Sequence, residues 1–425
     1  MIALRSYVIA ATNAPKVNAA QLYQIGALIK IRDELNASKS KLDALFSKED
    51  FQAVWNGCDP FKIEKKRFAQ IANAQHVSNA WLKCYEMICY YKLIPAGEHS
   101  AGTAFVHFDN AAFPGSFILA AHHFAVTRTA SLSETKLVPA ERTASLGERT
   151  ESLSENAPKL VRYEWRGSSL IEQNELNAAP ISDKYGLYRN YKDNWLMSAQ
   201  NNGDVLLRTN QEDFMARLAH GVDLYTSDIG FDVSSDFNNQ ELIQCPANIG
   251  QIISGLLTLR EGGNFITKQF SIFEPITISI MYAAAHFFEK FYLCKPTTSR
   301  AANSETYLVG IGFKMPKDYV GDDIIDHPYI AAMFDRIETK SIVPLFLPED
   351  YPKGFLKGIR DIAQELASSQ IEKIEADIKR YESGDPTVVS EFIASLENDI
   401  EEWYAANYVV PISDEMQLNA FAPAN

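Results

Sequence analysis

Short apolar runs alternate with helical segments through the middle of the chain. Apolar residues recur at helical spacing in 69–93, 118–125, 246–263 and 275–290. Strands that alternate with helices in this way predict an α/β fold, in which helices cover both faces of a mostly parallel sheet. The runs rich in β-branched and aromatic residues, which favour strands, are TAFVHF (103–108), LVRYEW (160–165), GDVLLRT (203–209), VDLYTSD (222–228), NFITKQF (264–270), FYLCKP (291–296) and TYLVGIGF (306–313).

The last two of these runs are too close together for a crossover helix. Only residues 297–305 separate them, whereas a parallel connection needs a dozen residues or more. We therefore expect the last strand to run antiparallel to the others.

A near-exact repeat interrupts the pattern between the first two strands. The heptads RTASLSE (128–134), RTASLGE (142–148) and RTESLSE (149–155) lie in a segment rich in Ser, Thr and Glu. Such a composition predicts an expanded, disordered surface insertion over 127–159, with a helical coil as the alternative.

Composition narrows the class of protein. Hydrophobic residues make up 46% of the 425 residues, which is enough for a large core, and no apolar run reaches the ~18 residues that span a bilayer. Five scattered cysteines without a CxxC pair indicate free thiols in a reducing compartment, so we expect a cytoplasmic protein.

The charge balance argues against one mode of nucleic-acid binding. The formal net charge is −14, which disfavours coating nucleic acid by bulk charge but leaves room for a local basic groove. FKIEKKRFAQ (61–70) supplies a candidate cluster, and a solvated helix face explains the same residues equally well. The cluster consists of Lys62, Lys65, Lys66 and Arg67.

Four charged residues are expected to meet at one rim of the sheet. Asp228 and Lys268 end two predicted strands, and ligands of open parallel sheets bind beyond the carboxyl ends of the strands. Glu305 precedes the last strand, whose start reaches the same rim if that strand is antiparallel, and Lys83 comes from the helix before the first strand. Each residue alone also fits a simpler role, as a solvated strand end, a cap, a local partner of Arg300 or a snorkelling lysine.

Converging charges of this kind suit proton transfer. Burying charge costs several kcal/mol unless the groups are well paired, so such a cluster calls for a functional reason. Desolvation disfavours the protonated form of a lysine and neighbouring carboxylates favour it, so a balance of the two can hold a lysine that accepts a proton near neutral pH.

The segment 262–314, GGNFITKQFSIFEPITISIMYAAAHFFEKFYLCKPTTSRAANSETYLVGIGFK, resembles the catalytic half of eukaryotic and viral cap-specific mRNA 2′-O-methyltransferases of the RrmJ/FtsJ type. KPTTSRAANSE (295–305) is its most specific part. NAWLKCYEM (79–87) and SDIGFD (227–232) match the segments that carry the family's first lysine and its aspartate. The resemblance covers roughly 70–315 and is strongest to members from large cytoplasmic DNA viruses.

This resemblance implies a Rossmann-like methyltransferase fold and a Lys-Asp-Lys-Glu tetrad. The tetrad falls on Lys83, Asp228, Lys268 and Glu305, with Lys268 as the general base for a ribose 2′-hydroxyl. It also implies S-adenosylmethionine as cofactor and no metal.

The cofactor turn departs from the family's pattern. Members hold S-adenosylmethionine over a turn such as GxPGGF, and here the turn reads DNAAFPGSF (109–117). A strand, a Pro-Gly turn and a helix is the usual cofactor arrangement, and serine is small, so we expect binding to survive. The expected cofactor residues are Asp109, Pro114, Gly115, Ser116, Phe117, Asp204 near the adenine, and Asp228.

The resemblance implies capped mRNA as the partner, with other capping or transcription proteins as a further class. Tyr188, Tyr191 and Trp195 are candidates to stack on the cap guanine, with core packing as the role of at least one. Two alternatives stay open: a non-catalytic RNA-binding or scaffold protein on the same fold, and an enzyme acting on ribosomal or transfer RNA. Whether the first or the second transcribed nucleotide is modified is also open.

We expect three parts along the chain. Residues 1–68 form an N-terminal extension, 69–330 the methyltransferase domain, and 331–425 a C-terminal extension whose charged helices cover 355–384 and 393–405.

Overall fold

A computed structural model describes residues 4–418 except 13, 18–20, 96–103, 135–161, 171–181, 231–232, 234–235, 317–318, 320, 322 and 408. Within these residues a seven-stranded sheet has the order β1-β6-β7-β5-β4-β2-β3. The strands are β1 (Arg5–Val8), β2 (Phe105–Asn110), β3 (Tyr163–Ser168), β4 (Val222–Ser227), β5 (Leu259–Gln269), β6 (Phe288–Lys295) and β7 (Thr306–Phe313).

The sheet is mixed in the way the sequence predicted. β3, β2, β4 and β5 pair in parallel, while β7 lies between β5 and β6 and is antiparallel to both. The expectation of a mostly parallel α/β sheet with an antiparallel last strand is confirmed. β1 adds an antiparallel edge strand beside β6, which we had not predicted because its four residues, RSYV, carry too little pattern.

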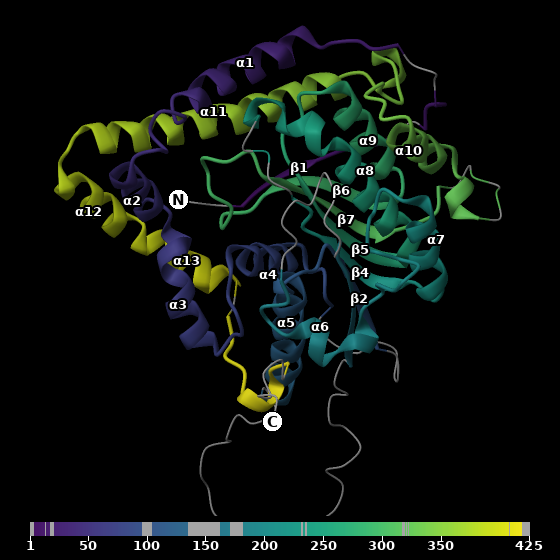
Figure 1. Ribbon diagram of the computed structural model, residues 1–425, viewed down its shortest axis with the longest axis horizontal. Helices are drawn as coiled ribbons and strands as arrows, with labels where there is room; N and C mark the ends of the chain where they lie inside the picture. Colours follow the sequence, from purple (N-terminus) through teal and green to yellow (C-terminus); the bar gives the residue numbers. More distant parts are fainter. Residues whose placement is uncertain are drawn as a thin grey trace, which may run out of the picture.

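Helices cover both faces of the sheet (Figure 1). One core unites α8 (Gln240–Thr258), α9 (Pro275–Ala285) and α10 (Pro328–Glu338) with one face of the strands. The other core joins α4 (Asn79–Tyr91) and α5 (Ser116–Glu134) to the opposite face. Neighbouring residues of β4 and β7 divide between the two cores: Leu224 and Tyr307 join the core of α4 and α5, whereas Tyr225 and Leu308 join the other.

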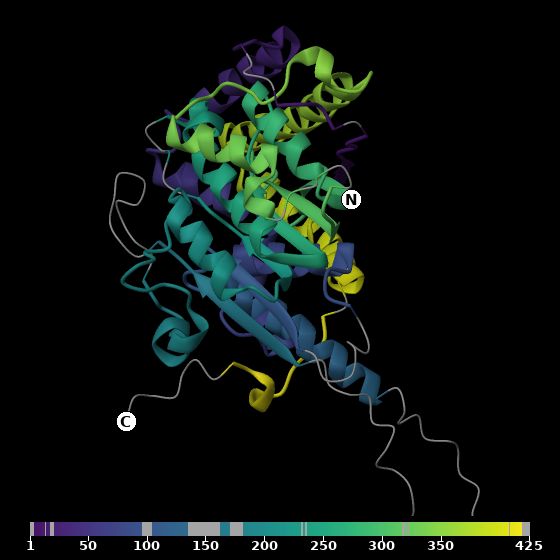
Figure 2. The ribbon, with the colours of Figure 1, turned by 90° about the vertical axis from the view of Figure 1, so that its right-hand side faces the viewer.

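The two ends of the chain meet beside the sheet. α1 (Gly26–Ser40) lies along α11 (Phe355–Glu382), and both helices share the first core. A further group of helices from the two ends lies together on one side of the molecule, as Figures 1 and 2 show. The group consists of α2 (Glu49–Gly57), α3 (Pro60–Ala72), α12 (Pro386–Ser395) and α13 (Glu397–Asn407). The remaining helices are α6 (Leu187–Asn190) and α7 (Arg208–Arg217), with 3₁₀ turns at Lys192–Asn194, Phe237–Asn239, Ile324–Asp326, Pro348–Asp350 and Asp414–Met416.

Sequence predictions of local structure were wrong in four places. The helix expected over 393–405 is divided between α12 and α13 at Leu396, and the helix expected over 246–263 ends at Thr258, where β5 begins.

The other two errors concern segments whose structure is set by side-chain caps and left-handed residues. The run 203–209 is no strand: Gly203 has a left-handed φ of 80° and Asp204 caps the Leu206 amide, so the chain turns and enters α7. The helix over 69–93 is two helices, because Asn73 ends α3 in the left-handed conformation and Ser78 caps α4. Apolar periodicity continues across both caps and therefore hides them.

The repeat insertion is described only at its start. α5 runs to Glu134, so the first heptad copy, 128–134, lies at the end of that helix. The rest of the predicted insertion, 135–159, lies outside the described residues.

All five cysteines are free thiols in this structure. None of the helices in the described ranges has the length and apolarity to span a membrane.

Candidate active site

The four charged residues selected from the sequence come together as two ion pairs. Lys83 on α4 places its Nζ 2.5 Å from Glu305 Oε1, just before β7. Lys268 near the end of β5 places its Nζ 2.9 Å from Oδ1 of Asp228, which follows β4. The parallel neighbours β4 and β5 and the antiparallel β7 bring these side chains to one rim, as the topology argument required.

The hydroxyl of Tyr307 links the two pairs. It donates to Asp228 Oδ1 at 2.8 Å and lies 3.0 Å from Glu305 Oε1. We had not singled out Tyr307 from the sequence. A signal existed, because Tyr307 is two residues after Glu305 and so shares its face of the strand. Tyr307 also pairs in register with Lys268 across β5 and β7.

Burial and pairing fix the charge states in one of these pairs. Burial acts to lower the pKa of Lys83, but Glu305 and Asp228 outweigh it and hold that pKa above its ordinary value. Burial acts to raise the pKa of Glu305, and Lys83 and Lys268 outweigh it, so the pKa falls well below the usual range. Burial, together with Asp228 and Glu305, raises the pKa of Tyr307, which keeps its hydroxyl a donor.

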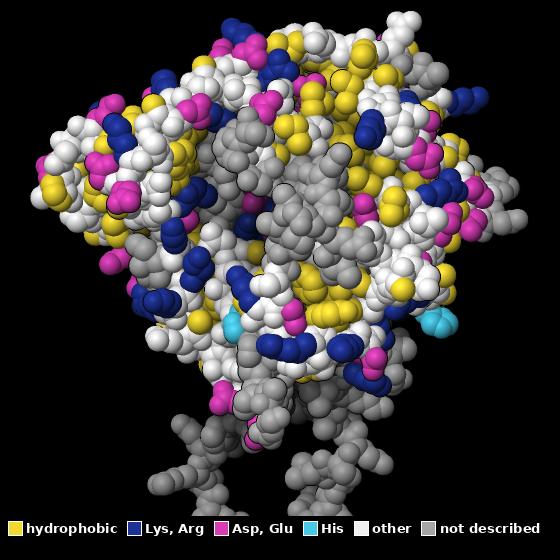
Figure 3. Space-filling view, in the orientation of Figure 1, with side chains coloured by type: hydrophobic (Ala, Val, Ile, Leu, Met, Phe, Trp, Pro, Cys, Tyr) yellow, Lys and Arg dark blue, Asp and Glu magenta, His cyan; other side chains and the backbone are white. Residues whose placement is uncertain are grey.

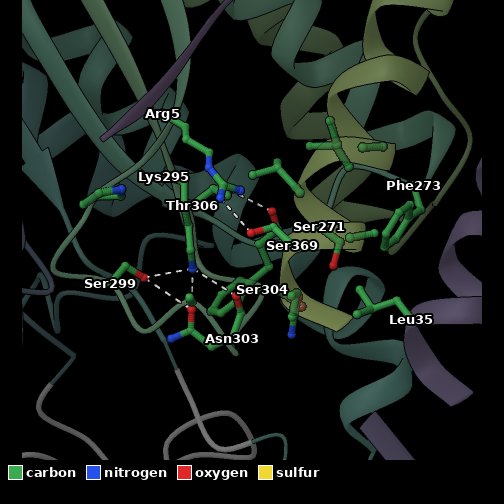
Figure 4. Close-up of a pocket in the computed structure, with 18 of the residues that line it drawn as sticks. Arg5, Leu35, Ser271, Phe273, Lys295, Ser299, Asn303, Ser304, Thr306 and Ser369 are labelled. Carbon is green, nitrogen blue, oxygen red and sulfur yellow. Dashed lines mark hydrogen bonds between the residues drawn. The ribbon is translucent and has the colours of Figure 1, made fainter. Parts of the chain in front are cut away.

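A buried lysine holds the loop that carries Glu305 (Figure 4). Lys295 Nζ donates to Asn303 Oδ1 at 2.6 Å and to the Glu305 carbonyl at 2.8 Å. It also donates to Ser299 Oγ at 3.1 Å, the Arg300 carbonyl at 3.1 Å and the Asn303 carbonyl at 2.9 Å. Five oxygens of one loop lie within hydrogen-bond distance of this one amino group, whose N–H donors number at most three, and these contacts fix the path of residues 299–305.

The other side of this loop rests on α4. Glu86 is buried and accepts from the Thr297 amide at 2.8 Å, the Thr298 amide at 3.0 Å and Thr298 Oγ1 at 2.7 Å. Lys83 and Glu86 are one helical turn apart, so α4 both supports the loop and reaches Glu305. The sequence motif KPTTSRAANSE thus contains its own anchor, Lys295, whose role the motif alone did not reveal.

A first cavity, of about 350 Å³, opens on the Asp228–Lys268 side of the tetrad. We call it the turn cavity, because the DNAAFPGSF turn forms one wall. Six of the seven expected cofactor residues line it: Asp109, Pro114, Ser116, Phe117, Asp204 and Asp228. Asn110, Ser169, Leu170 and Val205 also line it and were missed, since no pattern marks them.

Gly115, the seventh residue, shapes the turn without lining the cavity. Its φ is +114°, in the region that favours glycine. A Cβ at this position would lie 2.2 Å from Leu187 Cδ1, and Leu187 is fully buried. Ala111 in the same turn also has a positive φ, of 56°, so the glycine is retained at the position where a Cβ would in addition meet a buried side chain.

Ser116 faces α4 with its hydroxyl. Ser78 Oγ donates to Ser116 Oγ at 2.8 Å and itself accepts from the Trp81 amide at 3.1 Å, capping α4. The serine that replaces the family's glycine thus ties the N-termini of α4 and α5 together. Deeper in the cavity Asp109 accepts from Thr226 Oγ1 at 2.6 Å, and burial raises the pKa of this carboxyl well above its ordinary value.

A second cavity, of about 810 Å³, opens on the Lys83–Glu305 side of the tetrad. We call it the basic groove. It runs between the N-terminal helical segment 39–65, the 298–305 loop and Gln370 of α11. Figure 3 shows this face of the molecule hollowed between α2 and the sheet, with Lys and Arg side chains on the α2–α3 side.

The tetrad stands between the two cavities. Asp228 and Lys268 line the turn cavity, whereas Lys83 and Glu305 line the basic groove. Of the basic cluster named from the sequence, Lys62 and Lys65 line the groove, and Lys66 and Arg67 are not among its lining residues. No group of three or more His, Cys, Asp or Glu side chains that could hold a metal ion is found in the part of the chain that the structure describes.

The aromatic residues considered for cap stacking do not line either cavity. Trp195 is 2% exposed and packs against Phe113 and Trp165, with ring centroids 4.7 and 5.9 Å away. The expected core-packing role is thereby confirmed for Trp195. Tyr188 and Tyr191 pack on Phe113 and Trp165 in the same cluster, beside the turn cavity.

Comparison with known proteins identifies relatives of this arrangement. A family model described as FtsJ-like methyltransferase matches residues 76–313. A probable methyltransferase of African swine fever virus (isolate Pig/Kenya/KEN-50/1950) is 33% identical over 291 residues, 65% of this chain and 59% of that protein. Cap-specific mRNA (nucleoside-2′-O-)-methyltransferase 2 of Drosophila melanogaster is 26% identical over 379 residues, 86% of this chain and 48% of that protein.

The chain therefore spans 59% and 48% of the length of these two curated relatives. Among solved structures, a putative ribosomal RNA methyltransferase from Plasmodium falciparum aligns with a TM-score of 0.29 and 15% identity, over 56% of this chain and 97% of that one.

Proposed function

This chain belongs to the FtsJ-like methyltransferase family, and we propose that it transfers a methyl group from S-adenosylmethionine to a ribose 2′-hydroxyl near the 5′ cap of mRNA. The observation that carries the proposal is the position of the tetrad, with a cavity on each side. A transferase that joins two substrates needs two sites that meet at the reacting atoms.

The turn cavity suits the cofactor. Its volume of about 350 Å³ falls within the range of small-molecule sites, roughly 300–1,000 Å³. The left-handed Gly115 folds the turn back at the N-terminus of α5, and Ser116 directs its hydroxyl to Ser78. Asp204 and Asp228 would bind the cofactor's polar groups. When bound, S-adenosylmethionine supplies the activated methyl group.

Lys268 is the residue we assign as general base. Its Nζ, in the neutral form, would take the proton of the 2′-hydroxyl, and Asp228 at 2.9 Å would stabilise the ammonium that results. Lys83 and Glu305 stay ionised as a pair and would orient the hydroxyl from the groove side. Tyr307 holds both carboxylates in place through one hydroxyl.

Capped mRNA is the substrate that the relatives favour. A relative at 26% identity is named as a cap-specific mRNA 2′-O-methyltransferase. We propose the same substrate class for this chain. We also propose that residues 69–330 form the methyltransferase domain and that residues 1–68 and 331–425 are extensions of it.

The first experiment measures methyl transfer from labelled S-adenosylmethionine to a short capped RNA. We expect transfer by the wild type and a loss of at least about 10²-fold in Lys268→Ala, the range expected when a general base is removed. Calorimetric affinity for S-adenosylmethionine should stay within about threefold, because the turn is untouched. Lys66→Ala, an exposed lysine of α3 that does not line either cavity, is the control.

Three outcomes would contradict parts of the proposal. Wild-type activity in Lys268→Ala would remove Lys268 as the base. Equal transfer to uncapped RNA would favour ribosomal or transfer RNA as substrate. Absence of both transfer and cofactor binding would leave a scaffold on a methyltransferase fold.

A further inference from the structure

One wall of the basic groove comes from outside the family match. Lys39, Phe46, Trp55, Lys62 and Lys65 all line it. These residues precede residue 76, where the FtsJ-like model begins to match. The N-terminal segment therefore builds a concave surface directly against Lys83 and Glu305 of the tetrad.

The charge of the groove opposes the charge of the chain. The whole sequence carries 54 acidic against 40 basic residues. Among groove-lining residues the balance reverses, with five cations (Lys39, Lys62, Lys65, Lys83, Arg300) facing three carboxylates (Asp43, Asp236, Glu305).

Two lysines of the groove have lowered pKa values. Burial lowers the pKa of Lys65; Asp59 opposes this, and the like charges of Lys62 and Arg300 lower it further. Burial likewise lowers the pKa of Lys39 to about 8, with Glu241 opposing. An anion bound along this wall would favour the charged form of both lysines and raise their pKa values.

An aromatic pair stands among these cations. Phe46 is 39% exposed and packs edge-on against Trp55, with ring centroids 5.2 Å apart. Arg300 lies over the face of Trp55, with Cζ 5.4 Å from the ring centroid. An exposed ring beside several cations is the combination that binds single-stranded nucleic acid, where phosphates meet lysines and a base stacks on the ring.

The depth of the tetrad favours a single strand over a duplex. The side chains of Lys83 and Glu305 are only 9% and 14% exposed. A ribose reaches them only if its nucleotide enters the groove, which an unpaired strand can do because its bases are free to splay out.

We propose that the N-terminal segment 39–65, together with Arg300, is a binding site for single-stranded RNA: Lys39, Lys62 and Lys65 contact phosphates, and Phe46 stacks on a base. That the bound strand continues to a reacting ribose rests on the proposed function. The binding itself does not.

The test measures the affinity of a labelled, uncapped single-stranded RNA of about ten nucleotides as a function of KCl. The variant is Lys62→Glu with Lys65→Gln in the full chain. We expect at least tenfold weaker binding. We also expect the slope of log affinity against log salt to become shallower by about 0.7 for each phosphate that the variant no longer neutralises.

The control carries the same change of charge away from the groove. Lys66→Glu with Lys30→Gln alters two lysines that do not line it, one on α3 and one on α1, where the Lys30 side chain is 80% exposed. Its affinity should stay within twofold of the wild type. Thermal unfolding of both doubles excludes a general loss of structure.

The aromatic part is tested separately with Phe46→Ala. We expect roughly tenfold weaker binding with an unchanged salt slope, since stacking is not ionic. The proposal would be overturned if the groove double variant and the control double variant lost RNA affinity equally, or if the groove double variant lost none. Tighter binding of an acidic peptide than of RNA in direct competition would also overturn the proposal, in favour of a protein partner.

The outcome is independent of catalysis. RNA binding that depends on Lys62 and Lys65 in a protein without methyl transfer would leave the groove proposal standing and remove the proposed function. Methyl transfer to capped RNA, together with unchanged binding of uncapped RNA by the groove double variant, would leave the proposed function standing and remove the groove proposal.

Discussion

At the scale of single residues, the site is a balanced set of buried charges. Two lysines and two carboxylates face one another, and the Tyr307 hydroxyl contacts both carboxylates. The four charges could be selected from the sequence, because their strand ends and the family resemblance mark them. Lys295 could not, since its role depends on the fold of a loop. Tyr307 was marked only by its spacing from Glu305, and its contact with Asp228 also depends on the register of β5 with β7.

The Lys83–Glu305 pair makes stability depend on pH in a definite direction. The pKa of Glu305 is below its unfolded value of about 4.3. Its stabilisation is therefore complete above about pH 5 and is lost as the pH falls through the folded-state pKa. We expect Glu305→Gln to lower the free energy of unfolding by about 3 kcal/mol at pH 7, because Lys83 loses its buried partner.

That difference between wild type and Glu305→Gln should shrink as the pH is lowered from about 5 toward 3, measured by urea unfolding at each pH. Glu34→Gln is the control, since Glu34 and Lys30 form an exposed pair at 3.9 Å that contributes about 0–1 kcal/mol. A Glu305→Gln difference that stays constant with pH would contradict the assigned charge states.

At the scale of elements, periodicity predicted the helices and strands better than their limits. β2, β4, β5, β6 and β7 lie where the runs of apolar residues predicted them. The helix ends at Asn73 and Ser78 were missed because a cap is set by one residue's conformation and one hydrogen bond, while the apolar stripe continues. The run 203–209 was misassigned for a similar reason, since a side-chain cap from Asp204 decides its turn.

At the junction of α4, α5 and the DNAAFPGSF turn, substitutions at two adjacent positions should affect cofactor binding to very different extents. Gly115→Ala places a Cβ against buried Leu187 in a left-handed conformation, which should cost about 1–3 kcal/mol of stability. We expect it to weaken S-adenosylmethionine binding at least tenfold, because the turn must move. Ser116→Ala removes only the hydrogen bond with Ser78, about 1 kcal/mol, and should leave cofactor affinity within threefold.

Calorimetry on the two variants, with urea unfolding alongside, checks this pair. Loss of cofactor binding in Ser116→Ala would mean that the serine hydroxyl acts in the cavity and not at the helix junction. Undiminished binding in Gly115→Ala would mean that the turn does not hold the cofactor.

At the scale of the molecule, the ends of the chain enclose the site from outside the matched region. β1 extends the sheet beside β6, and Ser304 of the 298–305 loop donates a hydrogen bond to Gln370 of α11 at 3.0 Å. The division of the chain into a methyltransferase domain, 69–330, and two extensions, 1–68 and 331–425, stays a prediction. In packing, the flanking segments share a core with the sheet: Leu28, Ile31 and Leu35 of α1 join the cluster that contains α8 and α9.

A shared core predicts a single unfolding transition. Leu35 is 2% exposed and packs in one cluster with Ile359, Ala363 and Ala367 of α11, so Leu35→Ala should cost about 2–5 kcal/mol. If the helices and the sheet unfold together, circular dichroism and tryptophan fluorescence will report the same midpoint, shifted by the same amount. Leu22→Ala, at a side chain that is 63% exposed, should shift neither signal. Two separate transitions, of which Leu35→Ala moves only one, would show that α1 and α11 form an independent unit and that the groove lies at a boundary able to open.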